Sequence, residues 1–113
     1  MKKDILTIRD LSKKDIFSFI DRGLQIKKEG RRARSTLSGY TLGLLFEKAS
    51  TRTRISFETA MFRLGGQTLF LNKADLQMSR DETVQDTVRV LSRYLDGLAI
   101  RTYSQDVIEE MAG

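Results

Sequence analysis

The sequence predicts an α/β fold in which a parallel sheet is flanked by helices. Two observations lead to this fold class. Three short apolar runs have the length and composition of buried strands. Stretches with helical periodicity follow each of these runs. Strands that alternate with helices pair in parallel through right-handed crossovers, so we expect the order β-α-β-α-β-α after a first helix.

The first helix is expected within residues 10–30. Ser12 and Asp15 stand at the spacing of a capping box at its start. Gly30 is suited to end it, because glycine readily adopts the left-handed conformation that follows many helices. One apolar face is predicted, and it consists of Ile16, Ile20 and Leu24.

The three strands are expected at residues 40–46, 67–71 and 98–101. A helix of about residues 52–64 separates the first two. Its apolar positions follow the i, i+3, i+4, i+7 spacing of one helical face. They are Phe57, Ala60, Met61 and Leu64. The pair Gly65-Gly66 is expected to end this helix.

A polar stretch, residues 72–82, precedes the next predicted helix. Thr83 and Asp86 form a capping-box pair at its start. Its apolar face is expected to hold Val84, Val88, Leu91 and Leu95. Asp96-Gly97 then turns the chain into the third strand. Ser104 is expected to cap a last helix, whose apolar residues are Val107, Ile108 and Met111.

Composition limits the possible functions. With 113 residues, 40% of them hydrophobic, the chain suits one soluble domain. The absence of cysteine and histidine excludes a disulfide framework, a thiolate zinc site and a Ser-His-Asp triad within the chain. No apolar run approaches the roughly 20 residues of a membrane helix, so we expect a cytoplasmic protein without a membrane partner. The net charge of +5 suits nucleic acid, an anionic membrane surface or a small anionic ligand.

Residues 50–54, Ser-Thr-Arg-Thr-Arg, concentrate positive charge and hydroxyls where a strand ends and a helix begins. We call them the STRTR segment. A helix start offers unpaired amides and the positive end of its dipole, hydroxyls add donors, and Arg52 offers a bidentate fork to phosphate oxygens. Arg101 ends the third strand at the same expected edge of the sheet. The segment therefore predicts an anion site, although ordinary helix caps and surface arginines are the alternative.

Other charged groups are assigned to structure. Residues 27–34 are rich in lysine and arginine, but no aromatic residues are interleaved, so a solvated helix end is favoured over a nucleic-acid patch. Glu58 stands at i+4 from Arg54 and is expected to pair with it. Asp81, Glu82 and Asp86 crowd a helix start, where carboxylates favour the dipole, so no metal site is expected. Core or interface packing is expected of Phe57, Met61 and Phe62.

Four segments together resemble the amino-terminal half of the carbamoyltransferases, and most closely the ornithine carbamoyltransferases. They are FEKASTRTRISFE, LGGQTLFL, LQMSRDE and DTVRVLSRYLDGLAIRTYSQ. The resemblance covers essentially the whole chain in the right order. It implies a single carbamoyl-phosphate-binding domain at residues 1–113, with the aspartate/ornithine carbamoyltransferase N-terminal fold. The amino-acid-binding domain, with its His-Pro-x-Gln segment, is expected beyond Gly113, so the chain alone would be inactive.

The resemblance also implies roles for individual residues. Four residues correspond to the loop that binds the phosphate of carbamoyl phosphate: Ser50, Thr51, Arg52 and Thr53. Arg101 corresponds to the arginine that reaches the carbamoyl oxygen and the phosphate. Gln77 falls where these enzymes place a residue that reaches the neighbouring subunit's site, and members are trimers or multiples of trimers. Arg52 and Arg101 are the expected catalytic residues, because they would stabilise the charge that develops on oxygen.

The implied reaction joins carbamoyl phosphate and ornithine to give citrulline and phosphate, in arginine metabolism and the urea cycle. It needs no cofactor and no metal. Leu76 and Arg80 stand where aspartate-type relatives carry a serine and a lysine, which favours the ornithine type. Acetylornithine and putrescine remain alternative acceptors. Two other readings are a basic nucleic-acid-binding module and a non-catalytic scaffold relative, and the intact STRTR segment argues against the scaffold.

Overall fold

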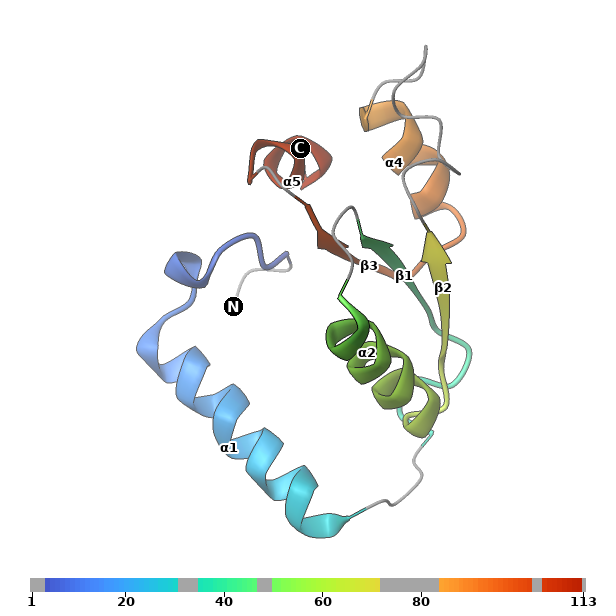
Figure 1. The fold of residues 1–113 in the computed structure, drawn as a ribbon. Helices are drawn as coiled ribbons and strands as arrows, with labels where there is room; N and C mark the ends of the chain where they lie inside the picture. The colour runs from blue at the N-terminus through green and yellow to red at the C-terminus, as the bar shows by residue number, and fades with distance from the viewer. Residues whose placement is uncertain (1–3, 31–34, 47–49, 72–83, 103–104, 113) are drawn as a thin grey trace. The chain divides into compact units, whose positions relative to one another are not determined.

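The computed structural model describes residues 4–30, 35–46, 50–71, 84–102 and 105–112. By its internal contacts the chain divides into two compact units, one formed mainly by Met1–Arg32 and the other mainly by Ala33–Met111. Figure 1 labels the α-helices and strands of both units. Among the described residues, no helix has the length and apolar character needed to cross a membrane.

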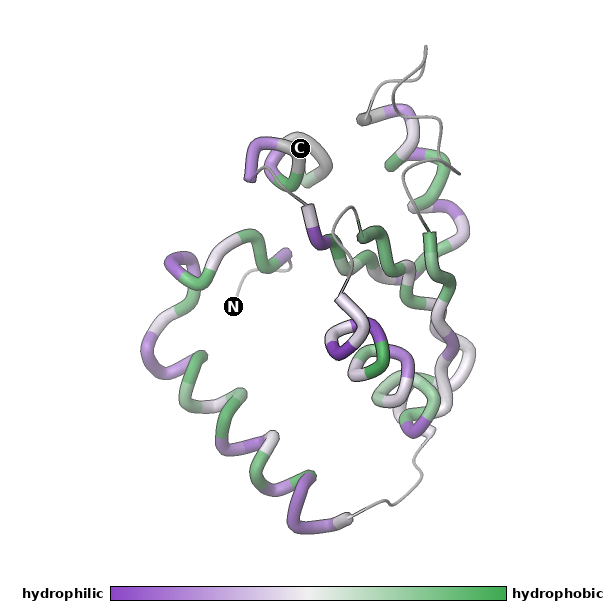
Figure 2. The backbone as a smooth tube through the Cα atoms, in the orientation of Figure 1, coloured by the Kyte–Doolittle hydropathy of each residue, from purple (hydrophilic) through white to green (hydrophobic). Residues whose placement is uncertain are grey.

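The first unit contains a short 3₁₀ helix, η1 (Ile8–Asp10), and α1 (Lys13–Glu29). The predicted capping box is confirmed. The Asp15 amide donates to the Ser12 hydroxyl at 3.0 Å, and the Ser12 amide donates to the Asp15 carboxylate at 3.2 Å. Gly30 ends the helix with a positive φ of 75°. Apolar and polar residues alternate along α1 in Figure 2, and none of its residues is buried.

The second unit is built on a three-stranded parallel sheet in the order β2-β1-β3. Its strands are β1 (Thr41–Phe46), β2 (Gln67–Leu71) and β3 (Gly97–Arg101), and they run side by side in Figure 1. Its helices are α2 (Thr51–Arg63), α4 (Val84–Ser92) and α5 (Gln105–Ala112). The predicted fold class and the order of elements are confirmed, and the boundaries agree to within three residues, with β2 as predicted.

Leu95 was expected on the helix that follows the polar stretch, and this expectation is wrong. The helix α4 ends at Ser92, and the next residues form a tight turn. In that turn the Arg93 amide donates to the Val90 carbonyl at 3.2 Å, and the Tyr94 amide donates to the Leu91 carbonyl at 3.0 Å. These i→i−3 bonds tighten the chain before it enters β3.

The core of the second unit is centred on β1. Leu44 is completely buried, and Leu45 and Phe46 are nearly so. Successive residues of a strand face opposite sides of the sheet, so burial of consecutive residues means that both faces are covered. On the Leu44 side, the Phe46 and Phe70 rings meet edge to face with centroids 6.0 Å apart. On the other side, Leu95 packs so closely that a Cβ atom on Gly43 would lie 2.5 Å from its Cδ1.

The predicted glycine stop of α2 is confirmed. Gly65 has a φ of 89° and donates its amide to the Phe62 carbonyl at 3.1 Å. Gly66 donates to the Met61 carbonyl at 2.9 Å. These two bonds form a Schellman motif, which satisfies carbonyls at the helix end. Met61 is buried, whereas Phe62 is 80% exposed and therefore lies outside the core of this chain.

Hydrogen bonds around Thr41 hold the amino ends of all three strands together. The Thr41 amide donates to the Asp96 carboxylate at 2.8 Å, and the Asp96 amide donates to the Thr41 carbonyl at 2.9 Å. On the other side, the Gln67 side-chain amide donates to the Thr41 hydroxyl at 2.8 Å. Asp96 directly precedes β3 and Gln67 is the first residue of β2, so Thr41 joins the start of β1 to both neighbours.

Several predictions concern residues outside the described part of the chain. They include the two predicted caps at Thr83 and Ser104. They also include residues 72–82, with Leu76, Gln77 and Arg80. The basic residues at positions 31–34 fall outside it as well.

Candidate functional site

The STRTR segment lies at the junction between β1 and α2. Ser50 is the N-cap residue, and the helix begins at Thr51, one residue before the predicted start. The Arg54 amide donates to the Ser50 carbonyl at 3.0 Å, which closes the first helical turn. The amides of this turn stand at the positive end of the helix dipole. The segment therefore occupies the kind of helix start that binds anions.

Ser50 does not act as an ordinary N-cap. Its side chain accepts no hydrogen bond from the amides of the first turn. Instead, its hydroxyl donates to the Thr53 hydroxyl at 2.8 Å. A hydroxyl that accepts one bond still has its own proton to donate, so Thr53 keeps a donor for a ligand. The two side chains are part-buried and hold each other at the start of the helix.

Thr51 and Arg52 lie on the outside of the same turn, and both are exposed. The backbone carbonyl of Arg52 accepts a hydrogen bond from the Ser56 hydroxyl at 2.8 Å. This bond uses only the backbone of Arg52 and does not involve its guanidinium group. An exposed guanidinium beside a helix start is well suited to bind a phosphate oxygen pair.

Arg101 is brought to the same edge of the sheet. It is the last residue of β3, it is exposed, and it stands opposite Phe46 in the parallel register of β1 and β3. Neighbouring strands lie about 4.8 Å apart. Phe46 ends β1, and Ser50 follows it by four positions. The carboxyl ends of β1 and β3 lie side by side (Figure 1), and open α/β sheets bind ligands at such ends. Arg101 ends β3, and the STRTR segment follows β1.

Arg54 is placed differently from Arg52. Its guanidinium carbon lies 3.7 Å from the centroid of the Phe70 ring on β2. Its Nε donates to the Glu58 carboxylate at 3.0 Å, which confirms the predicted i, i+4 pair. The contact with Phe70 was not foreseen from the sequence. Phe70 stands 16 positions later in the chain, and no local spacing signals a contact of that kind.

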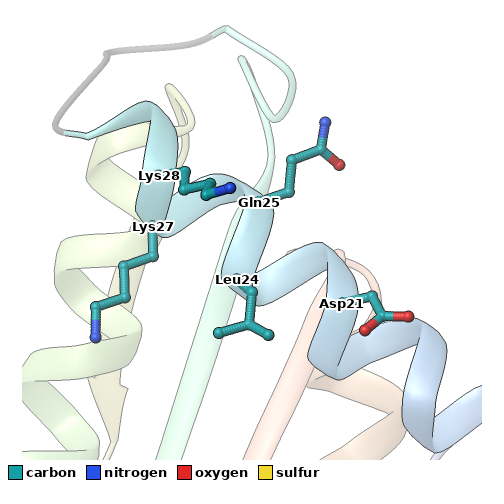
Figure 3. A pocket seen from close by; sticks show the side chains of 5 residues that line it. All are labelled: Asp21, Leu24, Gln25, Lys27 and Lys28. Carbon is teal, nitrogen blue, oxygen red and sulfur yellow. The ribbon is translucent and has the colours of Figure 1, made fainter.

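A separate hollow is found on α1, outside the predicted site. Figure 3 shows the side chains that line it, which are Asp21, Leu24, Gln25, Lys27 and Lys28. All five are exposed and come from one helix. The exposure of the two lysines fits the expected solvated end of this helix. None of the residues predicted to bind a ligand lines the hollow.

Comparison with known proteins identifies the family. Residues 3–113 match the family model described as the aspartate/ornithine carbamoyltransferase, carbamoyl-P binding domain. The chain is 46% identical to the ornithine carbamoyltransferase of Methanosarcina acetivorans and 49% identical to that of Syntrophus aciditrophicus. Each alignment covers 99% of this chain but only 38% of the relative.

The fold agrees with the same family. The crystal structure of ornithine carbamoyltransferase from Thermus thermophilus superposes with a TM-score of 0.89 at 34% identity. The superposition covers 99% of this chain and 39% of that one. The chain thus spans well under half the length of the relatives that it matches. It belongs to the aspartate/ornithine carbamoyltransferase family and carries that family's carbamoyl-phosphate-binding domain.

Proposed function

We propose that the chain binds carbamoyl phosphate between the STRTR segment and Arg101, as part of an ornithine carbamoyltransferase. The observation that carries this proposal is the register of β1 and β3, which pairs Phe46 with Arg101 at the carboxyl end of the sheet. A helix start rich in donors and a second arginine then share one edge. Such an edge can hold a phosphate at the helix and a carbonyl group beside it.

In the proposed reaction, an amine attacks the carbonyl carbon of carbamoyl phosphate, negative charge builds on the carbonyl oxygen, and phosphate leaves. Arg52 and the amides of the first α2 turn hold the phosphate. Arg101 and the Thr53 hydroxyl donate to the carbonyl oxygen, where the charge develops. These residues act by orientation and by electrostatic stabilisation of the transition state. The acceptor is bound by the part of the enzyme that this chain does not span.

Ornithine is the acceptor favoured by this proposal. The relatives named above are ornithine carbamoyltransferases, and Leu76 and Arg80 replace the serine and lysine expected in the aspartate type. Because the family description includes both aspartate and ornithine enzymes, the acceptor needs its own test. The complete protein is incubated with carbamoyl phosphate and, in turn, ornithine, aspartate, acetylornithine or putrescine. Of the four acceptors, only ornithine is expected to give phosphate release. If another amine gave a higher rate, that amine would be the acceptor instead of ornithine.

The proposal includes a cytoplasmic trimer in which Gln77 reaches the neighbouring subunit's site. Its test is complementation between inactive subunits of the complete enzyme. One subunit carries Arg52→Met and the other carries Gln77→Ala. Mixed trimers should recover activity, because some sites receive both intact residues. If mixing restores no activity while Gln77→Ala alone is inactive, Gln77 acts within its own subunit.

Binding by the chain itself is tested by phosphorus NMR titration with carbamoyl phosphate. Saturable binding is expected for the unsubstituted chain, and Arg52→Met should weaken it by about 100-fold, as for loss of a bidentate charge-assisted pair. Arg63→Met is the matched control, because it removes an exposed arginine from the other end of α2. No saturable binding by the unsubstituted chain, or equal losses for both variants, would overturn the proposed site. A citrulline assay of the chain alone should detect no product.

A further inference from the structure

Arg54 is attached to the sheet through its side chain. The guanidinium group lies over the face of the Phe70 ring, with its central carbon 3.7 Å from the ring centroid. Its Nε donates to Glu58 on the next turn of α2 at 3.0 Å. The side chain is 43% exposed, so one side of it is covered by these contacts. A guanidinium held over a ring in this way is directed toward the protein.

The Phe70 ring that Arg54 contacts is connected to the proposed site through Phe46. Phe70 meets Phe46 edge to face at 6.0 Å, with the ring planes at 83°. Phe46 is nearly buried and is the last residue of β1. It stands opposite Arg101 in the register of β1 and β3. A continuous series of contacts therefore runs from Arg54 through two aromatic rings to the strand position paired with Arg101.

The backbone of Arg54 belongs to the turn that would hold the phosphate. Its amide donates to the carbonyl of Ser50, the N-cap residue, at 3.0 Å. The same residue thus closes the first turn of α2 with its backbone and holds that turn against β2 with its side chain. The orientation of this turn decides where its amides and Arg52 point. Small displacements of binding groups weaken binding and catalysis severely.

We infer that Arg54 is a positioning residue, which acts through its stack on Phe70 and does not contact the phosphate. Its contact with Phe70 fixes the first turn of α2 over the sheet and so aims Ser50, Thr51 and Arg52 toward the position of Arg101. This inference rests on the proposed function, because it assigns a role in the same site. It separates the two arginines of the STRTR segment: Arg52 binds the ligand, and Arg54 holds the turn.

The inference is tested by two replacements of Arg54 with different packing. Methionine keeps a long side chain that makes favourable sulfur contacts with an aromatic ring, but it has no charge. Alanine removes both the charge and the contact. If Arg54 positions the turn, Arg54→Ala should weaken carbamoyl-phosphate binding about tenfold and Arg54→Met less than about threefold. If Arg54 binds the phosphate directly, the two variants lose affinity equally, and the inference is wrong.

Phe70→Leu provides a second test, because it removes the ring and keeps an apolar side chain. It should weaken binding about as much as Arg54→Ala, although Phe70 is not proposed to touch the ligand. The double variant should be no weaker than the weaker single variant, since both changes break one contact. Independent, additive losses would overturn the inference. Binding by Phe70→Leu at the unsubstituted level would do the same.

Amide hydrogen exchange without ligand shows whether the turn itself has loosened. Arg54→Ala and Phe70→Leu should raise the exchange rate of the backbone amide at position 54, which bonds the Ser50 carbonyl, while that of buried Leu44 stays constant. Faster exchange at both positions would indicate general destabilisation and would contradict a positioning role. The proposed function has a separate test. If the unsubstituted chain does not bind carbamoyl phosphate, the proposed function is wrong, whatever the Arg54 variants show.

Discussion

Phe46 and Arg101 stand opposite each other at the carboxyl ends of β1 and β3. Phe46 is nearly buried and Arg101 is exposed. The same edge of the sheet therefore has an apolar base and a charged rim. The STRTR segment begins four positions after Phe46. The register of β1 and β3 therefore brings Arg101 to the same edge of the sheet as this segment, although Arg101 lies 47 positions beyond Arg54 in the chain.

Arg52 and Arg101 should differ in the ligand atoms that they recognise. Arg52→Met removes a phosphate contact and should weaken the binding of inorganic phosphate and of carbamoyl phosphate by the same factor. Arg101→Met also removes a contact proposed to reach the carbonyl oxygen. It should therefore weaken the binding of carbamoyl phosphate about tenfold more than the binding of phosphate. Phosphorus NMR titrations with both anions measure the two ratios. If the ratio of the two affinity losses were the same for both variants, Arg101 would not contact the carbonyl oxygen.

The two N-cap serines, Ser12 and Ser50, should respond differently to alanine. Ser12 forms a capping box, so Ser12→Ala should cost α1 about 1 kcal/mol and speed exchange of the Asp15 amide about fivefold. Ser50 makes no cap bond, so Ser50→Ala should leave Thr53 amide exchange nearly unchanged. It should instead weaken carbamoyl-phosphate binding. A loss of helix protection in Ser50→Ala as large as in Ser12→Ala would contradict this distinction.

Gly65 should tolerate asparagine better than alanine. Its φ of 89° lies in the left-handed region, which costs an alanine roughly 1–2 kcal/mol, whereas asparagine visits that region more readily. Urea unfolding should therefore show a larger loss of stability for Gly65→Ala than for Gly65→Asn. If the order were reversed, the Schellman motif at the end of α2 would not be the source of the cost.

Asp96 should stabilise the sheet through its carboxylate oxygen. Asp96→Ala removes the carboxylate that accepts a hydrogen bond from the Thr41 amide. Thr41 is only 9% exposed. An unsatisfied buried donor costs about 1–3 kcal/mol, so the urea midpoint should fall. Asp96→Asn keeps a side-chain oxygen and should lose less. Equal losses for the two variants would assign the effect to charge instead of to this hydrogen bond.

Residue patterns were enough to predict the order of helices and strands, the capping box at Ser12, the glycine stops at Gly30 and Gly65, and the Arg54–Glu58 pair. All of these depend on residues a few positions apart, where backbone geometry sets which side chains meet. The sequence also located the STRTR segment at a helix start, because an apolar strand and a periodic helix flank it. Leu95 was misplaced, since helical spacing continues beyond the point where the chain turns and packs against Gly43.

The strand order β2-β1-β3, the register of the strands and the placement of Arg101 beside the β1 end became known from the folded structure. The folded structure alone showed that Arg54 stacks on Phe70 while Arg52 remains exposed. These contacts join residues far apart in the chain, whose pairing depends on how whole faces of the sheet and α2 fit together. Local residue patterns carry no information about that fit, because the same helix and strands could pack in several registers.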